Sequence, residues 1–249
     1  MLTAQDYRLS HTGPGKGIEY SESFQKLPYL RYLWEWEKTV LRQAVVQNFR
    51  NPAAVSHLDF ACGTGRIIGY METLVGKSVG VDVSDAMLEV GMRNVQRSVL
   101  VKVDLTKVNY FNGKQFDLIT AFRFFLNAQD SLRHEVMQVL ANHLKPNGRL
   151  VFNVHMNKTS FHAGLTRLKF WMTRRTEPLN MLSIEEVHEM VTRQGLEIQN
   201  IYHYGILPVK VKSQLLPIPL IDLIEKPASW VKPFARFSSQ LIFVCKRNA

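Results

Sequence analysis

The feature that most constrains this chain is a run of small residues at 61–65, which directly follows an apolar stretch ending at Phe60. Small residues let the backbone approach a ligand closely and adopt the dihedral angles of a tight turn between a strand and a helix. About one βα unit further on, Asp82 ends a second apolar stretch. A carboxylate at that strand end can accept hydrogen bonds from both hydroxyls of a ribose. The pattern therefore predicts a βαβ unit that binds a nucleoside.

Details of the turn indicate which nucleoside fits. A dinucleotide fingerprint needs a small residue at the sixth position counted from Gly63, but the bulky Ile68 stands there. No Gly-Lys-Ser/Thr follows the turn, which argues against a phosphate-binding P-loop. Asp59, beside the turn, would repel a pyrophosphate and attract an ammonium or a sulfonium. These residues favour S-adenosylmethionine over NAD.

Five segments follow one another in an informative order: residues 59–65, 82–88, 103–105, 116–125 and 144–150. In order and spacing they resemble the motifs of the class I S-adenosylmethionine-dependent methyltransferases of the small-molecule type. Ala61 stands where that family most often has its first glycine, a departure that the family tolerates. The resemblance covers about residues 20–156 well and the remainder loosely. It implies a methyltransferase with S-adenosylmethionine as cofactor.

The resemblance also implies which residues bind the cofactor. Asp82 is the expected ribose ligand, Met87 lies in the loop whose apolar residue contacts adenine, and Asp104 belongs to the turn that binds the adenine amino group. The whole expected set is Asp59, Ala61, Gly63, Thr64, Gly65, Arg66, Asp82, Val83, Met87, Asp104, Leu105 and Phe122. As alternatives, Asp82 could cap the next helix, Asp104 could be an ordinary turn residue and Met87 could belong to the core.

Methyl transfer mainly requires an acceptor atom held in line with the methyl carbon and, for a hydroxyl, a base that removes its proton. His155 follows Asn153 on one face of an expected strand, because side chains alternate along a strand. We expect His155 to be the catalytic base, with a structural histidine as the alternative. The expected substrate-binding residues are Arg123, Asn153, His162 and Tyr204. Arg123 could also bind the methionine carboxylate of the cofactor.

Apolar runs that alternate with helical patterns predict an α/β fold with a doubly wound, mostly parallel seven-stranded sheet, the Rossmann-like methyltransferase fold. Strands are expected near 56–60, 79–83, 99–103, 117–122, 149–154, 196–204 and 239–245, and helices near 66–75, 85–97, 130–144 and 183–194. Ser183 and Glu186 form a capping box at the start of the last helix. Pro28 opens a further amphipathic helix, expected to lie over the cofactor cleft.

Length and composition suit one domain, because 249 residues with 46% hydrophobic side chains can build a full core. Residues 1–50 are expected to form an N-terminal helical cap, whose polar, glycine-rich first 19 residues are predicted to be flexible. Insertions at 157–182, which is basic, and 207–238, which is apolar and rich in proline, follow strands on the carboxyl side of the sheet. Ligands of open α/β folds bind there. We expect both insertions to act as lids over an apolar or anionic acceptor, with surface padding as the alternative.

The net charge of +10 admits a polyanionic partner. Nucleic acid is disfavoured, because residues 121–124 lack the Asn/Asp-Pro-Pro-aromatic turn commonly used to methylate base amines. Cys62 and Cys245 have no metal or redox spacing, so no metal is expected and a reducing, cytoplasmic compartment is favoured. Neither a signal sequence nor a membrane span is indicated.

Together these patterns predict methyl transfer from S-adenosylmethionine to an oxygen or nitrogen of a small-molecule acceptor. The alternatives are an RNA or protein methyltransferase and a partner protein that binds S-adenosylmethionine without catalysis. A cavity plugged by Trp230, Phe234 or the aromatic residues of segment 20–36 would favour the non-catalytic alternative.

Overall fold

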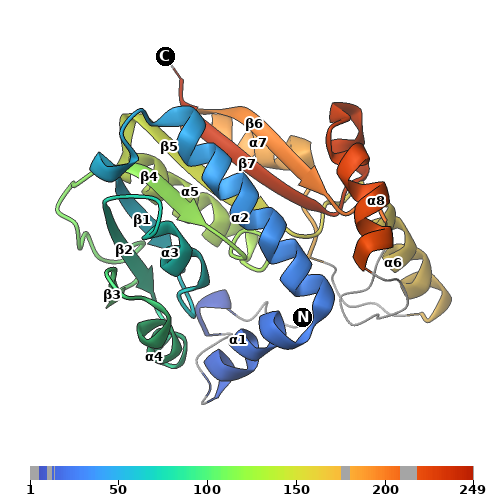
Figure 1. Ribbon diagram of the computed structural model, residues 1–249, viewed down its shortest axis with the longest axis horizontal. Coiled ribbons are helices and arrows are strands. Elements are labelled where there is room, and N and C mark those ends of the chain that lie inside the picture. Colours follow the sequence, from blue (N-terminus) through green and yellow to red (C-terminus); the bar gives the residue numbers. More distant parts are fainter. Residues whose placement is uncertain (1–5, 10–12, 14, 175–179, 208–217, 249) are drawn as a thin grey trace.

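A seven-stranded sheet in the order β3-β2-β1-β4-β5-β7-β6 forms the centre of the computed structural model, which describes residues 6–9, 13, 15–174, 180–207 and 218–248 (Figure 1). The strands are β1 Ser56–Phe60, β2 Lys77–Asp82, β3 Val99–Lys102, β4 Phe116–Ala121, β5 Leu144–Val154, β6 Leu196–Tyr204 and β7 Gln240–Arg247. Neighbours from β3 to β5 pair in parallel, and β7 is antiparallel to both β5 and β6. The predicted mostly parallel sheet is confirmed.

The helices begin at residues with recognisable start signals. Pro28 occupies the first turn of its helix, the Ser84 side chain accepts a hydrogen bond from the Met87 N–H, and Ser183 with Glu186 forms the expected capping box. The α-helices are α1 Lys16–Lys26, α2 Pro28–Asn48, α3 Arg66–Met71, α4 Asp85–Asn94, α5 Asp130–His143, α6 Phe161–Met172, α7 Ile184–Thr192 and α8 Ile218–Ser229. Short 3₁₀ helices are η1 Tyr7–Leu9, η2 Pro52–Ala54 and η3 Lys232–Phe237.

Helices cover both faces of the sheet. On one face α2 and α3 pack against alternate side chains of the strands, such as Leu118, Val151 and Ile242. On the other face α5 and α7 pack against Leu150 and Phe152, which flank Val151 along β5. Strands buried on both faces read as continuous apolar runs, which is why the sequence located them well.

The N-terminal segment departs from the expected flexibility. Tyr7–Leu9 form a 3₁₀ helix, and the Arg8 side chain in it makes ion pairs with Asp104 at 2.7 Å and Glu135 at 3.1 Å. A helix already begins at Lys16. Composition suggested a loose segment, but one arginine with two distant acidic partners fixes residues 7–9 over the carboxyl edge of the sheet.

Each insertion contains a helix at one end of the molecule, α6 in the first and α8 in the second (Figure 1). The two insertions meet where the ring of Phe161 stacks on that of Phe237, with centroids 5.1 Å apart. Residues 175–179 and 208–217 of the expected lids lie outside the described residues. Among the described helices, none combines the length and apolar character that crossing a membrane requires.

Candidate active site

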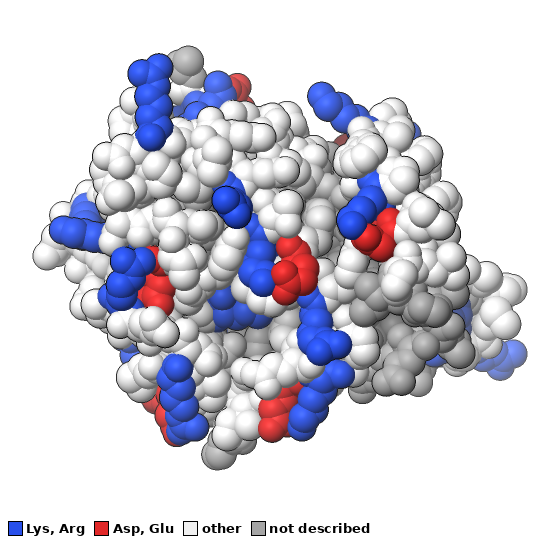
Figure 2. Space-filling view, viewed as in Figure 1, with Lys and Arg blue, Asp and Glu red and all other residues white. Residues whose placement is uncertain are grey.

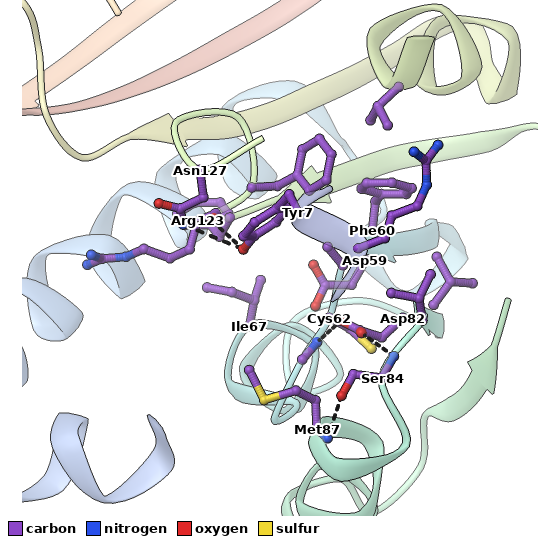
Figure 3. A pocket seen from close by; sticks show the side chains of 18 of the residues that line it. Tyr7, Asp59, Phe60, Cys62, Ile67, Asp82, Ser84, Met87, Arg123 and Asn127 are labelled. Carbon is purple, nitrogen blue, oxygen red and sulfur yellow. Dashed lines mark hydrogen bonds between the residues drawn. The ribbon is translucent and has the colours of Figure 1, made fainter. Parts of the chain in front are cut away.

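A pocket of about 200 Å³ opens at the carboxyl ends of β1, β2 and β4 (Figure 3). The chain passes from β1 to β2 on one side and from β4 to β5 on the other, so the pocket lies where the strand order reverses. Crossover helices diverge at such a point and leave a crevice that binds ligands in open α/β sheets. The fold alone therefore places the candidate site here.

The turn after β1 forms one wall of the pocket, and its backbone is left-handed at three positions. Ala61, Gly63 and Gly65 have φ values of 52°, 54° and 75°. A Cβ on Gly63 would meet nothing nearer than 3.9 Å, so this glycine keeps space open beside Met87. A Cβ on Gly65 would come within 3.1 Å of the Gly91 carbonyl oxygen. Gly65 therefore serves the packing of α3 on α4 and does not line the pocket.

Asp82, at the end of β2, joins two backbone segments of the pocket. One carboxylate oxygen accepts from the Gly63 N–H at 2.8 Å, and the other accepts from the Ser84 N–H at 2.9 Å. Asp82 also lines the pocket, and an ionised carboxylate can accept more than two hydrogen bonds. Ser84, not Asp82, accepts the side-chain cap bond of α4. The geometry thus suits the ribose role expected of Asp82.

Asp59 lies on the pocket wall at the end of β1 and is almost fully buried. Its Oδ1 accepts from the Thr120 hydroxyl at 2.5 Å, and its Oδ2 is buried without a hydrogen-bond partner among the described residues. Burial raises the pKa of Asp59 to about 7, although the Thr120 hydrogen bond and the charge of Arg66 act in the opposite direction. A bound cation would satisfy Oδ2 and favour the ionised carboxylate.

Two guanidinium groups gather at the Asp59 end of the pocket. Glu37 of α2 is buried, and it accepts from Arg66 at 2.5 Å and from Arg123 at 3.5 Å. The Arg66 guanidinium also stacks between the rings of Phe24 and Trp34, at 4.3 and 4.4 Å from their centroids. One carboxylate shared by two arginines leaves a net positive charge, which suits a ligand carboxylate.

Arg123 follows β4 in a left-handed conformation, with φ of 63°. Its N–H donates to Asn153 Oδ1 at 2.6 Å. Its carbonyl accepts from the Asn127 amide at 2.7 Å and from the Tyr7 hydroxyl at 3.3 Å (Figure 3). Such a backbone costs energy in a non-glycine residue and persists where neighbours hold it. Asn153 therefore positions Arg123 and does not reach the pocket itself.

His155 lies just beyond β5 and lines the pocket. Its Nδ1 is buried and has no hydrogen-bond partner in the part of the chain that the structure describes. Burial and then the charge of Arg123 hold its pKa well below 6.5. The imidazole is therefore neutral near pH 7 and has a free ring nitrogen, as a proton acceptor requires.

At the opposite end of the pocket, Asp104 is already engaged. Its Oδ2 accepts from Arg8 at 2.7 Å, and its Oδ1 accepts from the N–H and hydroxyl of Thr106. Met87 also lines the pocket, with its terminal carbon 3.9 Å from the position of a Cβ on Gly63. Arg8 therefore joins the N-terminal segment to the part of the pocket expected to hold adenine.

Most of the expected site residues do line this pocket: Asp59, Ala61, Gly63, Thr64, Arg66, Asp82, Val83, Met87, Asp104, Phe122, Arg123 and His155. Gly65, Leu105, Asn153, His162 and Tyr204 are not among its lining residues. Leu105 and Tyr204 belong to the core, and His162 lies on α6. No described residue of either insertion lines the pocket, and neither Trp230 nor Phe234 plugs it. Of the aromatic residues in segment 20–36, Tyr20 lines the pocket.

The sequence did not reveal Tyr7, Arg8 and Tyr20, which line the pocket, or Glu37, which holds its arginines. Only Glu37 left a trace in the sequence. It is an acidic residue on the side of α2 that also carries Leu33, Leu41 and other buried apolar residues, which is an unusual place for a charge.

Residues 58–152 match a family model described as a methyltransferase domain. The dTDP-4-amino-2,3,4,6-tetradeoxy-D-glucose N,N-dimethyltransferase of Saccharopolyspora spinosa is 36% identical over 103 residues, 40% of this chain and 40% of that protein. An uncharacterised methyltransferase of Schizosaccharomyces pombe is 30% identical over 132 residues, 48% of this chain and 46% of that protein. The chain thus spans less than half of the length of these curated relatives.

Solved structures resemble the whole chain. Magnesium protoporphyrin IX methyltransferase from Synechocystis PCC 6803, with bound S-adenosylhomocysteine, has a TM-score of 0.67 at 13% identity and covers 98% of this chain and 100% of its own. An N-methyltransferase from Bradyrhizobium japonicum, also with S-adenosylhomocysteine, has a TM-score of 0.59 at 13% identity and covers 91% of each chain. At such low identity these likenesses show the shared fold.

Proposed function

The chain carries a class I S-adenosylmethionine-dependent methyltransferase domain, and on this premise we propose that it methylates an oxygen or nitrogen atom of a small-molecule acceptor. One observation carries the proposal. A single pocket joins a ribose-type carboxylate, Asp82, to an end where Asp59, two arginines and His155 come together. The first end suits a nucleoside, and the second suits an amino acid moiety with a reacting group beside it.

Each end offers partners for a different part of the cofactor. Asp82 would accept from the ribose hydroxyls and Met87 would lie against the adenine. Asp59 Oδ2 would accept from the ammonium, and Arg66 and Arg123 would bind the carboxylate. S-adenosylmethionine supplies a methyl carbon bound to a positively charged sulfur, which is an excellent leaving group.

The protein's own task is to position the acceptor and to handle its proton. His155 faces the pocket beside Arg123, and its free Nδ1 can accept a proton from a hydroxyl or an ammonium. Tyr7 and Asn127, both hydrogen-bonded to the Arg123 carbonyl, line the pocket on the same side and would limit the access of water to the bound reactants. Exclusion of water strengthens the charge interactions that orient both reactants.

A small acceptor is supported by the way η1 lies over the pocket. Tyr7 of that segment lines the pocket and donates its hydroxyl to the carbonyl of Arg123, so η1 covers part of the acceptor side. A sugar nucleotide is the acceptor in the name of the relative from Saccharopolyspora spinosa, in agreement with a small molecule.

Two measurements test the function. Calorimetry should show S-adenosylmethionine binding that Asp82→Ala weakens by about 2–4 kcal/mol, the range for charge-assisted hydrogen bonds lost together. A panel of small hydroxyl and amine acceptors should then give release of S-adenosylhomocysteine with at least one of them. Affinity of Asp82→Ala within twofold of wild type would contradict the cofactor site. Tight binding with no turnover on small acceptors would favour the non-catalytic or the macromolecular alternative.

A further inference from the structure

Helix α6 presents its apolar side to solvent. Phe161, Leu165, Leu168 and Met172 follow the i, i+4, i+7, i+11 spacing of one helix face, and all four are exposed. The only described residue of α6 that is buried, Ala163, lies about 200° around the helix from Phe161. Trp171, 78% exposed, extends the apolar face. A helix of an isolated globular domain normally shows the opposite arrangement.

Helix α8 repeats this arrangement. Its inward side is the stripe of Ile221, Glu225 and Ala228, all buried. Its outward side carries Leu220, Leu223 and Ile224, which are exposed. Trp230, just after the helix, is 80% exposed. The surface formed by α6, α8 and η3 therefore carries two exposed tryptophans and a set of aliphatic side chains, which is more than the scattered apolar residues of an ordinary surface.

The charges around this surface are positive. Arg167, Lys169, Arg174 and Lys232 form no ion pair with another described residue, and Arg236 lies close enough to Glu185 to contribute to the lowered pKa of that carboxyl. The described acidic residues of the two insertions are Asp222 and Glu225. Asp222 is paired with Lys226, and buried Glu225 accepts from the N–H groups of Gly205, Ile206 and Leu207. Figure 2 shows white, uncharged surface over much of the described part of this end of the molecule, with a few Lys and Arg and one acidic group among it.

We propose that α6, α8 and η3 form a docking surface for a membrane that contains anionic lipids. Amphipathic helices with tryptophan on the apolar side and cations beside it bind in the plane of the lipid headgroups. A second copy of the chain would bring the same positive charge to the contact and repel the first, whereas anionic lipid would attract these cations. β5 and β6 both end at the sheet edge where the pocket opens, so docking would hold the pocket mouth near the bilayer.

Vesicle sedimentation with the whole protein tests this surface. We expect binding to phosphatidylcholine vesicles that contain about one third phosphatidylglycerol, weak binding to pure phosphatidylcholine, and loss of binding at high salt. Trp171→Glu with Trp230→Glu should lower the partition coefficient by about tenfold or more. Both tryptophan side chains are exposed in the free protein, and under the proposal they are buried only when the protein binds lipid. Arg167→Gln with Lys169→Gln and Arg174→Gln should remove most of the preference for anionic lipid.

Val46→Glu is the matched control, since Val46 is 65% exposed on α2, outside this surface. This variant should bind vesicles as wild type does. Equal binding by the tryptophan variant and wild type, or no preference for anionic vesicles, would overturn the proposal. So would a stable dimer in solution that the tryptophan substitutions dissociate, because a second copy would then cover the surface. Thermal unfolding of each variant checks that it is folded.

Discussion

Asp59 illustrates how a single buried carboxylate links ligand binding to protonation. Its Oδ2 has no partner among the described residues, and burial raises its pKa to about 7. Between about pH 4 and pH 7, the Asp59 carboxyl group therefore retains its proton, whereas an aspartate of the unfolded chain has already lost it. The free protein therefore carries an unfavourable charge above pH 7, and a cationic ligand relieves it.

The affinity for S-adenosylmethionine should accordingly rise by roughly tenfold between pH 5.5 and pH 7, as Asp59 becomes ionised. The stability of the free protein should move in the opposite direction. Since the folded pKa is the higher one, the stabilising contribution is present at about pH 4 and is lost as the pH rises towards 7. Calorimetry and thermal unfolding across this range measure both trends. Asp59→Asn should flatten them, and unchanged slopes in that variant would assign them to another group.

Gly63 and Gly65 should respond differently to the same substitution. Gly63→Ala places its Cβ in open space on the pocket side, so it should weaken cofactor binding while costing about 1–2 kcal/mol of stability for the left-handed backbone. Gly65→Ala adds a collision with the Gly91 backbone of α4 to that cost. Its free energy of unfolding should fall further. Urea unfolding and calorimetry distinguish the two positions, and the opposite ranking in stability would contradict the packing role of Gly65.

His155→Ala should lower the turnover number by about 10²-fold while leaving cofactor affinity nearly unchanged, if its free nitrogen accepts the acceptor's proton. Because its pKa lies well below 6.5, the imidazole of the wild type should stay neutral as the pH falls from 7.5 to 6. Turnover at saturating cofactor should therefore show no loss from histidine protonation in this range. Near-normal turnover in His155→Ala would leave positioning as the main contribution to catalysis.

At the scale of elements, the N-terminal segment lies over the pocket and contributes Tyr7 and Arg8 to its lining. Arg8 connects η1 to Asp104, Thr106 and Glu135. Arg8→Ala should release this segment and speed cofactor dissociation by about three- to tenfold, since a partly buried pair of charges contributes about 1 kcal/mol. Stopped-flow displacement measures the rate. Lys16→Ala, which removes an exposed pair with Glu19, is the control and should leave it unchanged.

The same segment marks the limit of prediction from sequence. Asp59, Gly63 and Asp82 lie on consecutive elements of one βαβ unit, so their spacing in the chain fixes their meeting in space. Arg8 meets Asp104 across 96 positions, and no local period encodes such a contact. The strands were predictable because burial on both faces makes them continuously apolar. The lid role of residues 157–182 and 207–238 stays a prediction, since none of their described residues lines the pocket.

At the scale of the whole molecule, β7 holds the sheet together beyond the nucleoside-binding half. It pairs with β5 on one side and β6 on the other, and Phe243 stacks on Phe152 with ring centroids 5.3 Å apart. Phe243→Ala should cost about 3–5 kcal/mol, as expected for a fully buried phenylalanine. Urea unfolding followed by fluorescence and by circular dichroism should show one shifted transition. A separate early transition would mean that β6 and β7 unfold as an independent unit.

The position of β7 also bears on how the chain folds while it is being made. β6 pairs only with β7 among the described strands, and β7 comes later in the chain. On the ribosome, β6 must therefore emerge with both edges unpaired and wait while α8 and η3 are synthesised. An unpaired strand edge is a template for association with other chains. This interval is the stage of synthesis at which a chaperone would protect the protein most.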